Sequence, residues 1–288
     1  PGYFSDENRF DYFERTSFSH NKWKLLIKYS KKKKINFMCS VFSKKAFDNL
    51  IRLGVKNIKI PSGELNNTPL LKYINSKKKL NVFVSTGMSS WSEIDSALNI
   101  LNNNKIILMQ CTSIYPCPEN MVGLNIISEM KKRYGKKYTY GFSDHTQGQE
   151  ASICSLVYGA KYIEKHITFS KKMYGSDARL AMEPNEFKNF CESIYKVKKI
   201  ISSKVNKNNL KPFIKTKKIF EKNIIARKTI QRGVKLKFSD LDFKKSIMGI
   251  KAKEYKNILG VKVKRKISKG RAILKKDLNE YSSKYPNL

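Results

Sequence analysis

The sequence predicts an α/β protein, a (β/α)8 barrel whose first two strands are absent from the chain, followed by a small β-rich domain. Short β-rich runs alternate with amphipathic stretches six times in succession, which is typical of parallel strands joined by helices. Polar residues collect after every run, as they do at the carboxyl ends of barrel strands. Beyond residue 218 the rhythm changes to β-like runs and tight turns.

The elements of the predicted barrel follow in a regular order. Residues 1–20 are polar and aromatic without a clear period, and residues 21–33 have helical spacing. The predicted strands are 35–39, 57–60, 80–84, 105–109, 138–142 and 162–166. The predicted helices are 44–53, 69–75, 91–101, 124–134, 148–159 and 185–201. Because a closed barrel has eight strands, we expect the first βαβ portion to lie upstream of this chain.

The composition divides the chain into three parts. We expect a partial barrel domain at 1–203, a polar, lysine-rich linker at 204–218 and a small domain at 219–288. The small domain has a weak internal repeat. Its β-like runs 223–230 and 260–267 each lead into a turn, a short hydrophobic piece and an Asp-Leu pair.

Charge and cysteine usage bound the possible functions. The 288 residues include 59 Lys and Arg and 23 Asp and Glu, for a net charge of +36. Such a field favours polyanions or phosphorylated small molecules. However, the lysines are scattered and not interleaved with aromatics, which favours a solvated surface and no nucleic-acid partner. The five cysteines form no CxxC pair, and no run is long enough to span a membrane. We therefore expect a reducing, cytoplasmic environment.

Two of the three histidines stand at the ends of neighbouring predicted strands. His145 follows one β-like run and His166 ends the next, with a helical stretch between them. Adjacent parallel strand ends could bring both imidazoles to one metal ion, with Asp144, Glu164 or Asp177 as oxygen ligands or hydrogen-bond acceptors. The alternative is a pair of ordinary hydrogen-bonded histidines.

The other strand ends carry groups suited to an anion. Small-residue turns begin at Ser62 and Ser85, and such turns offer hydroxyls and backbone N–H groups to a phosphate or carboxylate. Lys59 lies within a strand; if it points inward it needs an anionic partner, and otherwise it faces solvent. Glu64 is either a base or sugar-hydroxyl acceptor, or an N-terminal carboxylate of the next helix. Tyr115 could equally be a packing aromatic in a turn.

An ordered set of motifs resembles the sialic acid synthase family over residues 35 to 190. The motifs are FMCSVFS, IKIPSGELNNTPLL, VSTGMSSWSEI, LMQCTSIYPCPE, YGFSDHTQG, GAKYIEKHITFSKKMYGSD and AMEPNEF. The tail, with IIARKTIQRGVKLKFSDLDFKK and ILGVKVKRKISKGRAILKKDL, is similar to the antifreeze-like SAF domain that follows the barrel in that family.

The resemblance implies a condensation of phosphoenolpyruvate with the open-chain aldehyde of an N-acetylhexosamine. N-acetylmannosamine is the favoured substrate, which would give N-acetylneuraminate and phosphate. A divalent ion, Mn²⁺ or Mg²⁺, would polarise the aldehyde oxygen. One alternative is a legionaminic- or pseudaminic-type synthase that uses a diacetamido sugar. Another is an inactive, truncated chain that binds carbohydrate.

The resemblance also assigns roles to individual residues. The implied metal ligands are His145 and His166. The implied catalytic residues are Glu64, Lys59 and Asp177. The implied substrate-binding residues are Ser40, Ser62, Ser85, Ser113, Tyr115, Ser143 and Lys245. Lys245 would act across a domain-swapped homodimer.

Four residues depart from the family pattern. Ser40-Val41 replaces a threonine–proline pair, and Ala178 stands where many members have histidine or glutamine. Lys245 replaces an arginine and so lacks its bidentate fork.

Overall fold

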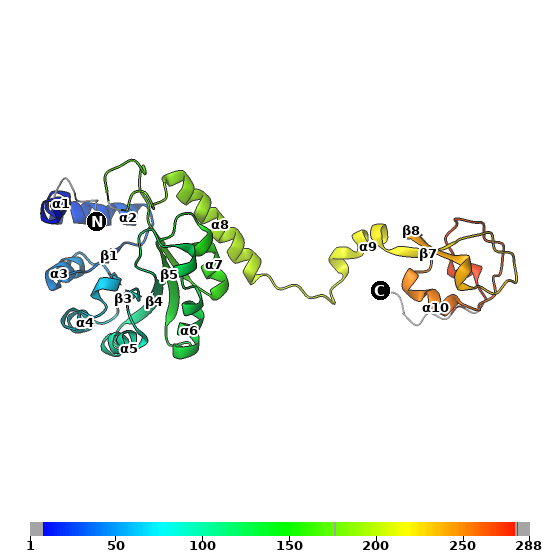
Figure 1. Cartoon of the computed structure of the whole chain (residues 1–288), viewed down its shortest axis with the longest axis horizontal. Coiled ribbons are helices and arrows are strands. Elements are labelled where there is room, and N and C mark those ends of the chain that lie inside the picture. The colour runs from blue at the N-terminus through cyan, green and yellow to red at the C-terminus, as the bar shows by residue number, and fades with distance from the viewer. Residues whose placement is uncertain (1–7, 176, 280, 282–288) are drawn as a thin grey trace. The chain divides into compact units, whose positions relative to one another are not determined.

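The computed structural model describes residues 8–175, 177–279 and 281, and the chain divides into two compact units, Pro1–Ser203 and Lys204–Leu288 (Figure 1). The first unit contains a parallel sheet of six strands in sequential order. These strands are β1 (Met38–Ser40), β2 (Asn57–Ile60), β3 (Asn81–Ser85), β4 (Lys105–Cys111), β5 (Thr139–Asp144) and β6 (Tyr162–Lys165). The sheet is barrel-like and has six strands, whereas a complete (β/α)8 barrel has eight, and this confirms the predicted fold class.

A helix follows each strand of this sheet, and Figure 1 shows these helices beside it. They are α3 (Lys44–Arg52), α4 (Thr68–Asn75), α5 (Trp91–Ile100), α6 (Asn125–Tyr134), α7 (Glu150–Tyr158) and α8 (Pro184–Ser202). Helix starts are set locally: Ser90 caps α5 in a capping box with Glu93, and Ser43 caps α3.

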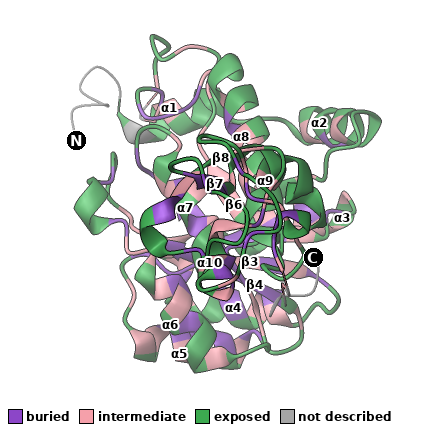
Figure 2. Cartoon of the chain, turned by 90° about the vertical axis from the view of Figure 1, so that its right-hand side faces the viewer, coloured by how far each residue is buried: buried purple, intermediate pink, exposed green. Residues whose placement is uncertain are grey.

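Side-chain alternation gives the sheet two different faces. Ile58, Val82 and Ile106 are register neighbours on one face, and they join the hydrophobic core formed with the helices. Figure 2 shows the corresponding pattern on the helices, whose outward surfaces are exposed. The next residues along the strands, among them Lys59 and Phe83, point to the opposite, concave face.

The concave face is strongly curved. Lys59 on β2 forms an ion pair with Glu164 on β6, four strand spacings away, which would be about 19 Å in a flat sheet. The rings of Phe83 on β3 and Tyr162 on β6 lie 5.2 Å apart between centroids. These contacts require the sheet to roll up, as the strands of a barrel do.

The N-terminal segment has more helix than the sequence pattern indicates. Helix α2 (His20–Lys32) was expected, but α1 (Arg9–Thr16) falls in the stretch predicted to have no regular period. Asn8 caps α1 by accepting a hydrogen bond from the backbone N–H of Asp11. An apolar pattern that extends over only about two helical turns is too short to distinguish such a helix from a loop.

The second unit is built on an antiparallel pair, β7 (Lys222–Ala226) and β8 (Leu241–Lys245). A separate hydrophobic core surrounds it, with Ile224, Leu241 and Ile250 fully buried. The predicted β-like run 260–267 forms isolated bridges instead of a named strand. The unit also contains α10 (Tyr255–Ile258).

The expected linker is partly helical. Within residues 204–218 the chain forms a short 3₁₀ turn, Lys211–Phe213, and then enters α9 (Ile214–Phe220). Pro212, which lies within the expected linker, occupies the first turn of this helical segment. A proline is tolerated there because the backbone N–H that it lacks would have no partner within the helix.

Asp144 does not face the site, contrary to the expectation that it could supply a metal ligand. It lies on the helix side of the sheet, where Lys165 Nζ is 3.0 Å from Asp144 Oδ2 and both side chains are inaccessible to solvent. The backbone N–H and hydroxyl of Thr146, together with the hydroxyl of Ser152, also donate to this carboxylate. Its acceptor positions are therefore occupied by structural partners beneath α7.

Lys165→Met should destabilise the first unit by about 3–5 kcal/mol, because it leaves the Asp144 carboxylate buried without its cation. The double variant Asp144→Asn/Lys165→Met should recover most of this loss. The exposed Lys161→Met is the matched control and should change stability by no more than about 0.5 kcal/mol. Urea unfolding followed by circular dichroism measures all three, and equal midpoints for Lys165→Met and Lys161→Met would contradict the structural role.

Candidate active site

Lys59 and Glu164 meet at the centre of the concave face. The side chain of Lys59 is only 5% exposed, whereas that of Glu164 is 38% exposed. A buried ammonium needs an anionic partner, and Glu164 supplies it. The carboxylate remains accessible, so solvent reaches the pair from the Glu164 side.

Hydroxyl and thiol groups surround the turn at Gly87. Its backbone N–H donates to Ser62 Oγ at 3.2 Å, and Ser62 Oγ lies 3.5 Å from Cys111 Sγ. Cys111 Sγ is also 3.8 Å from Ser113 Oγ. A Cβ atom on Gly87 would lie 2.7 Å from Ser62 Oγ and closer still to Ser113 Oγ. Glycine is therefore required for Ser62 and Ser113 to approach this turn together.

Ser85 supplies a buried hydroxyl without a partner in the described part of the chain. Its side chain is at the carboxyl end of β3, and the residue is 2% exposed. An unsatisfied buried hydroxyl costs free energy, so its persistence favours a bound acceptor. Ser40 is in register with Lys59, and Ser143 is in register with Glu164, so both belong to the concave face.

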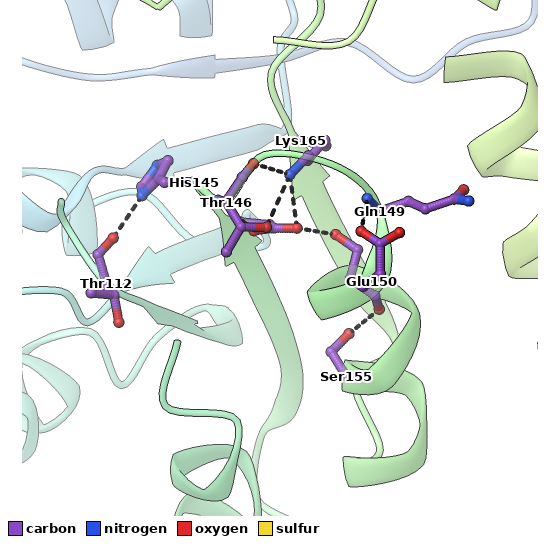
Figure 3. Close-up of polar contacts among 9 residues, drawn as sticks. Thr112, His145, Thr146, Gln149, Glu150, Ser155 and Lys165 are labelled. Carbon is purple, nitrogen blue, oxygen red and sulfur yellow. Dashed lines mark hydrogen bonds and ion pairs between the residues drawn. The ribbon is translucent and has the colours of Figure 1, made fainter. Parts of the chain in front are cut away.

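The hydrogen bond of His145 determines which of its two ring nitrogens is available to a ligand such as a metal ion. Its Nδ1 lies 2.8 Å from the carbonyl oxygen of Thr112. Since a carbonyl only accepts, Nδ1 carries a proton, and in the neutral imidazole Nε2 then has the lone pair. Figure 3 shows this bond apart from the network around Lys165 and Thr146. The consecutive residues Asp144 and His145 therefore have different roles. Asp144 forms the buried ion pair with Lys165, whereas His145 can offer a nitrogen lone pair to a ligand of the site.

His166 lies beside His145, with 5.4 Å between the ring centroids. His166 Nδ1 is 3.6 Å from Asp177 Oδ2, so Asp177 faces the histidine from the loop after β6. The ring of Tyr115 is 4.1 Å from that of His145 and 6.2 Å from that of His166. The predicted residues His145, His166, Asp177 and Tyr115 thus form one group.

The environment shifts several pKa values in this group. Burial lowers the pKa of His166, and His145 opposes its protonation, although Asp177 acts in the other direction. A lowered pKa keeps this imidazole neutral near pH 7, as a metal ligand must be. Burial, with the nearby Cys111, Asp177 and Glu164, raises the pKa of Tyr115 to about 12. Tyr115 is therefore a phenol that can donate a hydrogen bond.

The two histidines can act as ligands of a divalent metal ion, but the described side chains form no complete ligand set around them. Among residues 8–175, 177–279 and 281, no three His, Cys, Asp or Glu side chains gather as a metal-binding group. The protein would thus hold the ion through His145 and His166, leaving other positions to water or substrate oxygens. The Thr112 carbonyl and the Asp177 carboxylate orient the two rings, as partners of ligating histidines usually do.

Two predicted residues stand apart from this group. Glu64 ends a short 3₁₀ turn, Ser62–Glu64, and accepts a hydrogen bond from Asn67 Nδ2 at 2.7 Å. Lys245 belongs to β8 in the second unit, with its Nζ 4.8 Å from the ring centre of Phe220. Its reach into the site of a partner subunit stays a prediction.

Cys111 is a site residue that the sequence reasoning missed. The sequence pattern gives it no role in the site, but it contacts Ser62 and Ser113, and its Sγ lies 3.8 Å from His145 Nδ1. Burial alone would raise its pKa, but the contacts with His145 and Ser62 lower it. Strand parity was the available signal, because Cys111 is in register with Ser143.

Both parts of the chain are similar to known proteins. The model of the NeuB family matches residues 3–206, and that of the SAF domain matches residues 222–279. N,N'-diacetyllegionaminic acid synthase of Campylobacter jejuni is 35% identical over 89% of this chain and 77% of its own. The enzyme of that name from Legionella pneumophila is 32% identical over 83% and 68%. The solved N-acetylneuraminic acid synthetase of Leptospira borgpetersenii is 29% identical, with a TM-score of 0.64 over 71% and 72%.

Gly87→Ala should weaken the binding of phosphoenolpyruvate by at least about tenfold, because the added methyl group displaces the Ser62 and Ser113 hydroxyls. Gly63→Ala is the matched control, since nothing lies within 4 Å of a Cβ at that glycine. Titration calorimetry measures the affinity, and thermal melts show whether both variants fold. The assignment of this turn would be wrong if the two variants bound equally well.

Proposed function

Since the chain belongs to the NeuB family and ends in a SAF domain, we propose that it condenses phosphoenolpyruvate with a diacetamido hexose to form a nonulosonic acid and phosphate. The observation that carries this proposal is the convergence of an anion-binding set around Lys59 and an imidazole pair, His145 and His166, on one concave face. One group of side chains suits phosphoenolpyruvate and the other suits the reacting aldehyde.

The choice of sugar follows the relatives. Sequence motifs favour N-acetylmannosamine, but proteins named as N,N'-diacetyllegionaminic acid synthases are 35% and 32% identical to this chain. The human protein named N-acetylneuraminate-9-phosphate synthase is 30% identical. The balance supports the diacetamido sugar.

The anionic substrate would occupy the Lys59 side of the site. The Lys59 ammonium and the hydroxyls of Ser62, Ser85 and Ser143 would bind its phosphate and carboxylate groups, with Ser40 beside them. The hydroxyl of Ser85 would gain the acceptor that it lacks. Ser62 and Ser113 would hold the phosphate against the turn at Gly87.

The sugar would occupy the side of Tyr115 and Asp177. The phenol of Tyr115 would donate a hydrogen bond to the sugar, and the Asp177 carboxylate would accept from sugar hydroxyls. A divalent ion held by His145 and His166 would supply Lewis acidity to the aldehyde oxygen. The side chains then position C3 of phosphoenolpyruvate against the aldehyde carbon.

The reaction balances without a redox partner. A carbon–carbon bond forms between C3 of phosphoenolpyruvate and the aldehyde carbon, and the aldehyde oxygen gains a proton. Water adds at C2 of the former phosphoenolpyruvate, and the resulting tetrahedral centre loses inorganic phosphate to give a 2-keto acid. Lys59 and the surrounding hydroxyls can stabilise the negative charge of the departing phosphate.

Phosphate release should require phosphoenolpyruvate, Mn²⁺ and an amino sugar together, and should be faster with a 2,4-diacetamido hexose than with N-acetylmannosamine. A colorimetric phosphate assay measures the rate, and mass spectrometry identifies the nine-carbon acid. A faster rate with N-acetylmannosamine would overturn the choice of sugar. Binding of both substrates without any phosphate release would overturn the synthase proposal for this chain.

His145→Ala should abolish Mn²⁺-dependent phosphate release and weaken Mn²⁺ binding, because it removes one of two protein ligands. The exposed His20→Ala, which removes the third histidine at the start of α2, should leave both properties unchanged. Titration with Mn²⁺, followed by its electron paramagnetic resonance signal, measures binding independently of turnover. Unaltered Mn²⁺ affinity in His145→Ala would contradict the metal assignment.

A further inference from the structure

The second unit carries more than half of the net charge of the chain. Residues 204–288 contain 26 Lys and Arg and six Asp and Glu, so they contribute +20 of the total of +36. Four of the acidic residues described in this unit are already paired: Glu221, Asp240, Asp242 and Asp277. Most of the lysines therefore lack an internal counter-ion among the described residues.

Lysines also stand directly opposite one another between neighbouring segments. Lys222 of β7 is paired in register with Lys245 of β8, and the two strands run antiparallel. Lys235 forms an antiparallel bridge with Lys262. Like charges at directly opposed positions are destabilising. A bound polyanion would relieve this repulsion, whereas a second copy of so basic a unit would add to it.

A groove of about 540 Å³ lies within this unit, between α9 and the segment after β8. Its lining includes Leu210, Lys211, Ile214, Lys217, Lys218 and Ile247. In the described part of the chain, Lys211, Lys217 and Lys218 form no ion pair with an acidic side chain. Ile214 is 50% exposed and Ile247 is 87% exposed. The lining also includes Lys251, Lys253, Glu221 and Glu254, so five lysines and two carboxylates line a groove whose apolar side chains are accessible to solvent.

We propose that this groove binds an acidic oligosaccharide that carries a carboxylate on each sugar. Lys211, Lys217 and Lys218 would pair with the carboxylates, and Ile214 and Ile247 would contact the methyl groups of acetamido substituents. The amides of Asn208 and Asn209, which also line the groove, suit sugar hydroxyls. The choice of sugar acids among polyanions rests on the proposed function, whose product is such an acid.

The lining of the groove does not favour other polyanions. The side chains described in it include no aromatic ring on which a nucleic-acid base could stack. Its concave form also differs from the amphipathic helix that lies in a bilayer interface, and α9 has only seven residues.

The test is the binding of the full chain to a fluorescent oligomer of N-acetylneuraminate, measured by anisotropy without metal or phosphoenolpyruvate. The affinity should fall as salt rises, and Lys217→Glu/Lys218→Glu should lower it by at least about tenfold. A neutral dextran oligomer should not compete. Single-stranded DNA of equal charge should compete more weakly than the unlabelled sugar acid.

Lys264→Glu/Lys266→Glu is the matched control, because it makes the same charge change at exposed positions of the same unit outside the groove. It should retain most of the affinity. An equal loss in both variants, or equal competition by DNA, would overturn the proposal in favour of nonspecific attraction. Because the assay needs no turnover, absence of binding alongside normal phosphate release would reject this inference alone, and binding without phosphate release would reject only the synthase function.

Discussion

The ion pair between Lys59 and Glu164 is the contact on which the arrangement of the first unit depends. It joins side chains from β2 and β6, which a flat sheet would hold about 19 Å apart. The sheet must therefore roll up, and rolling brings the carboxyl ends of β2 to β6 around one space. Ser62, Ser85 and the two histidines come from four different strand ends, so only this curvature makes them parts of one site.

Side chains alternate between the two faces of the sheet, so the residues of the candidate site and the residues that stabilise the fold lie on opposite faces. Ser143 and Glu164 face the concave side, while Asp144 and Lys165 face α7 and form an ion pair excluded from solvent. The same lysine–carboxylate chemistry thus appears on both faces of the sheet, once accessible to solvent and once closed. A shift of one residue in β6 would turn Lys165 toward Lys59 and Glu164 toward Asp144. Both ion pairs would be lost, so the register of this strand is strongly constrained.

The fold was predictable because its signals are repeated. Six alternations of strand and helix are recovered, since each strand is bounded by turns and each helix has an apolar face. Helix α1 and the start of α9 were missed, because each is about two turns long and lies in a polar segment. Within the site, residue types identified the histidines and serines, but not the position of Asp144 or the contacts of Cys111. Those depend on which face of a strand a residue occupies, and on partners more than 20 residues distant.

Lys59 in the first unit and Lys217 and Lys218 in the second differ in whether a carboxylate already pairs with them, and this has consequences for anion binding. In the first unit, Lys59 already has a carboxylate partner, so an entering anion must compete with Glu164 and gains affinity only if it also fits the surrounding hydroxyls. Such competition favours selectivity over strength. In the second unit, Lys217 and Lys218 have no acidic partner in the described residues, so an anion gains their full attraction at once. That attraction is between exposed charges and is screened by salt within about 8–10 Å. Shape and apolar contact, provided by Ile214 and Ile247, must therefore supply whatever discrimination the groove has among anions.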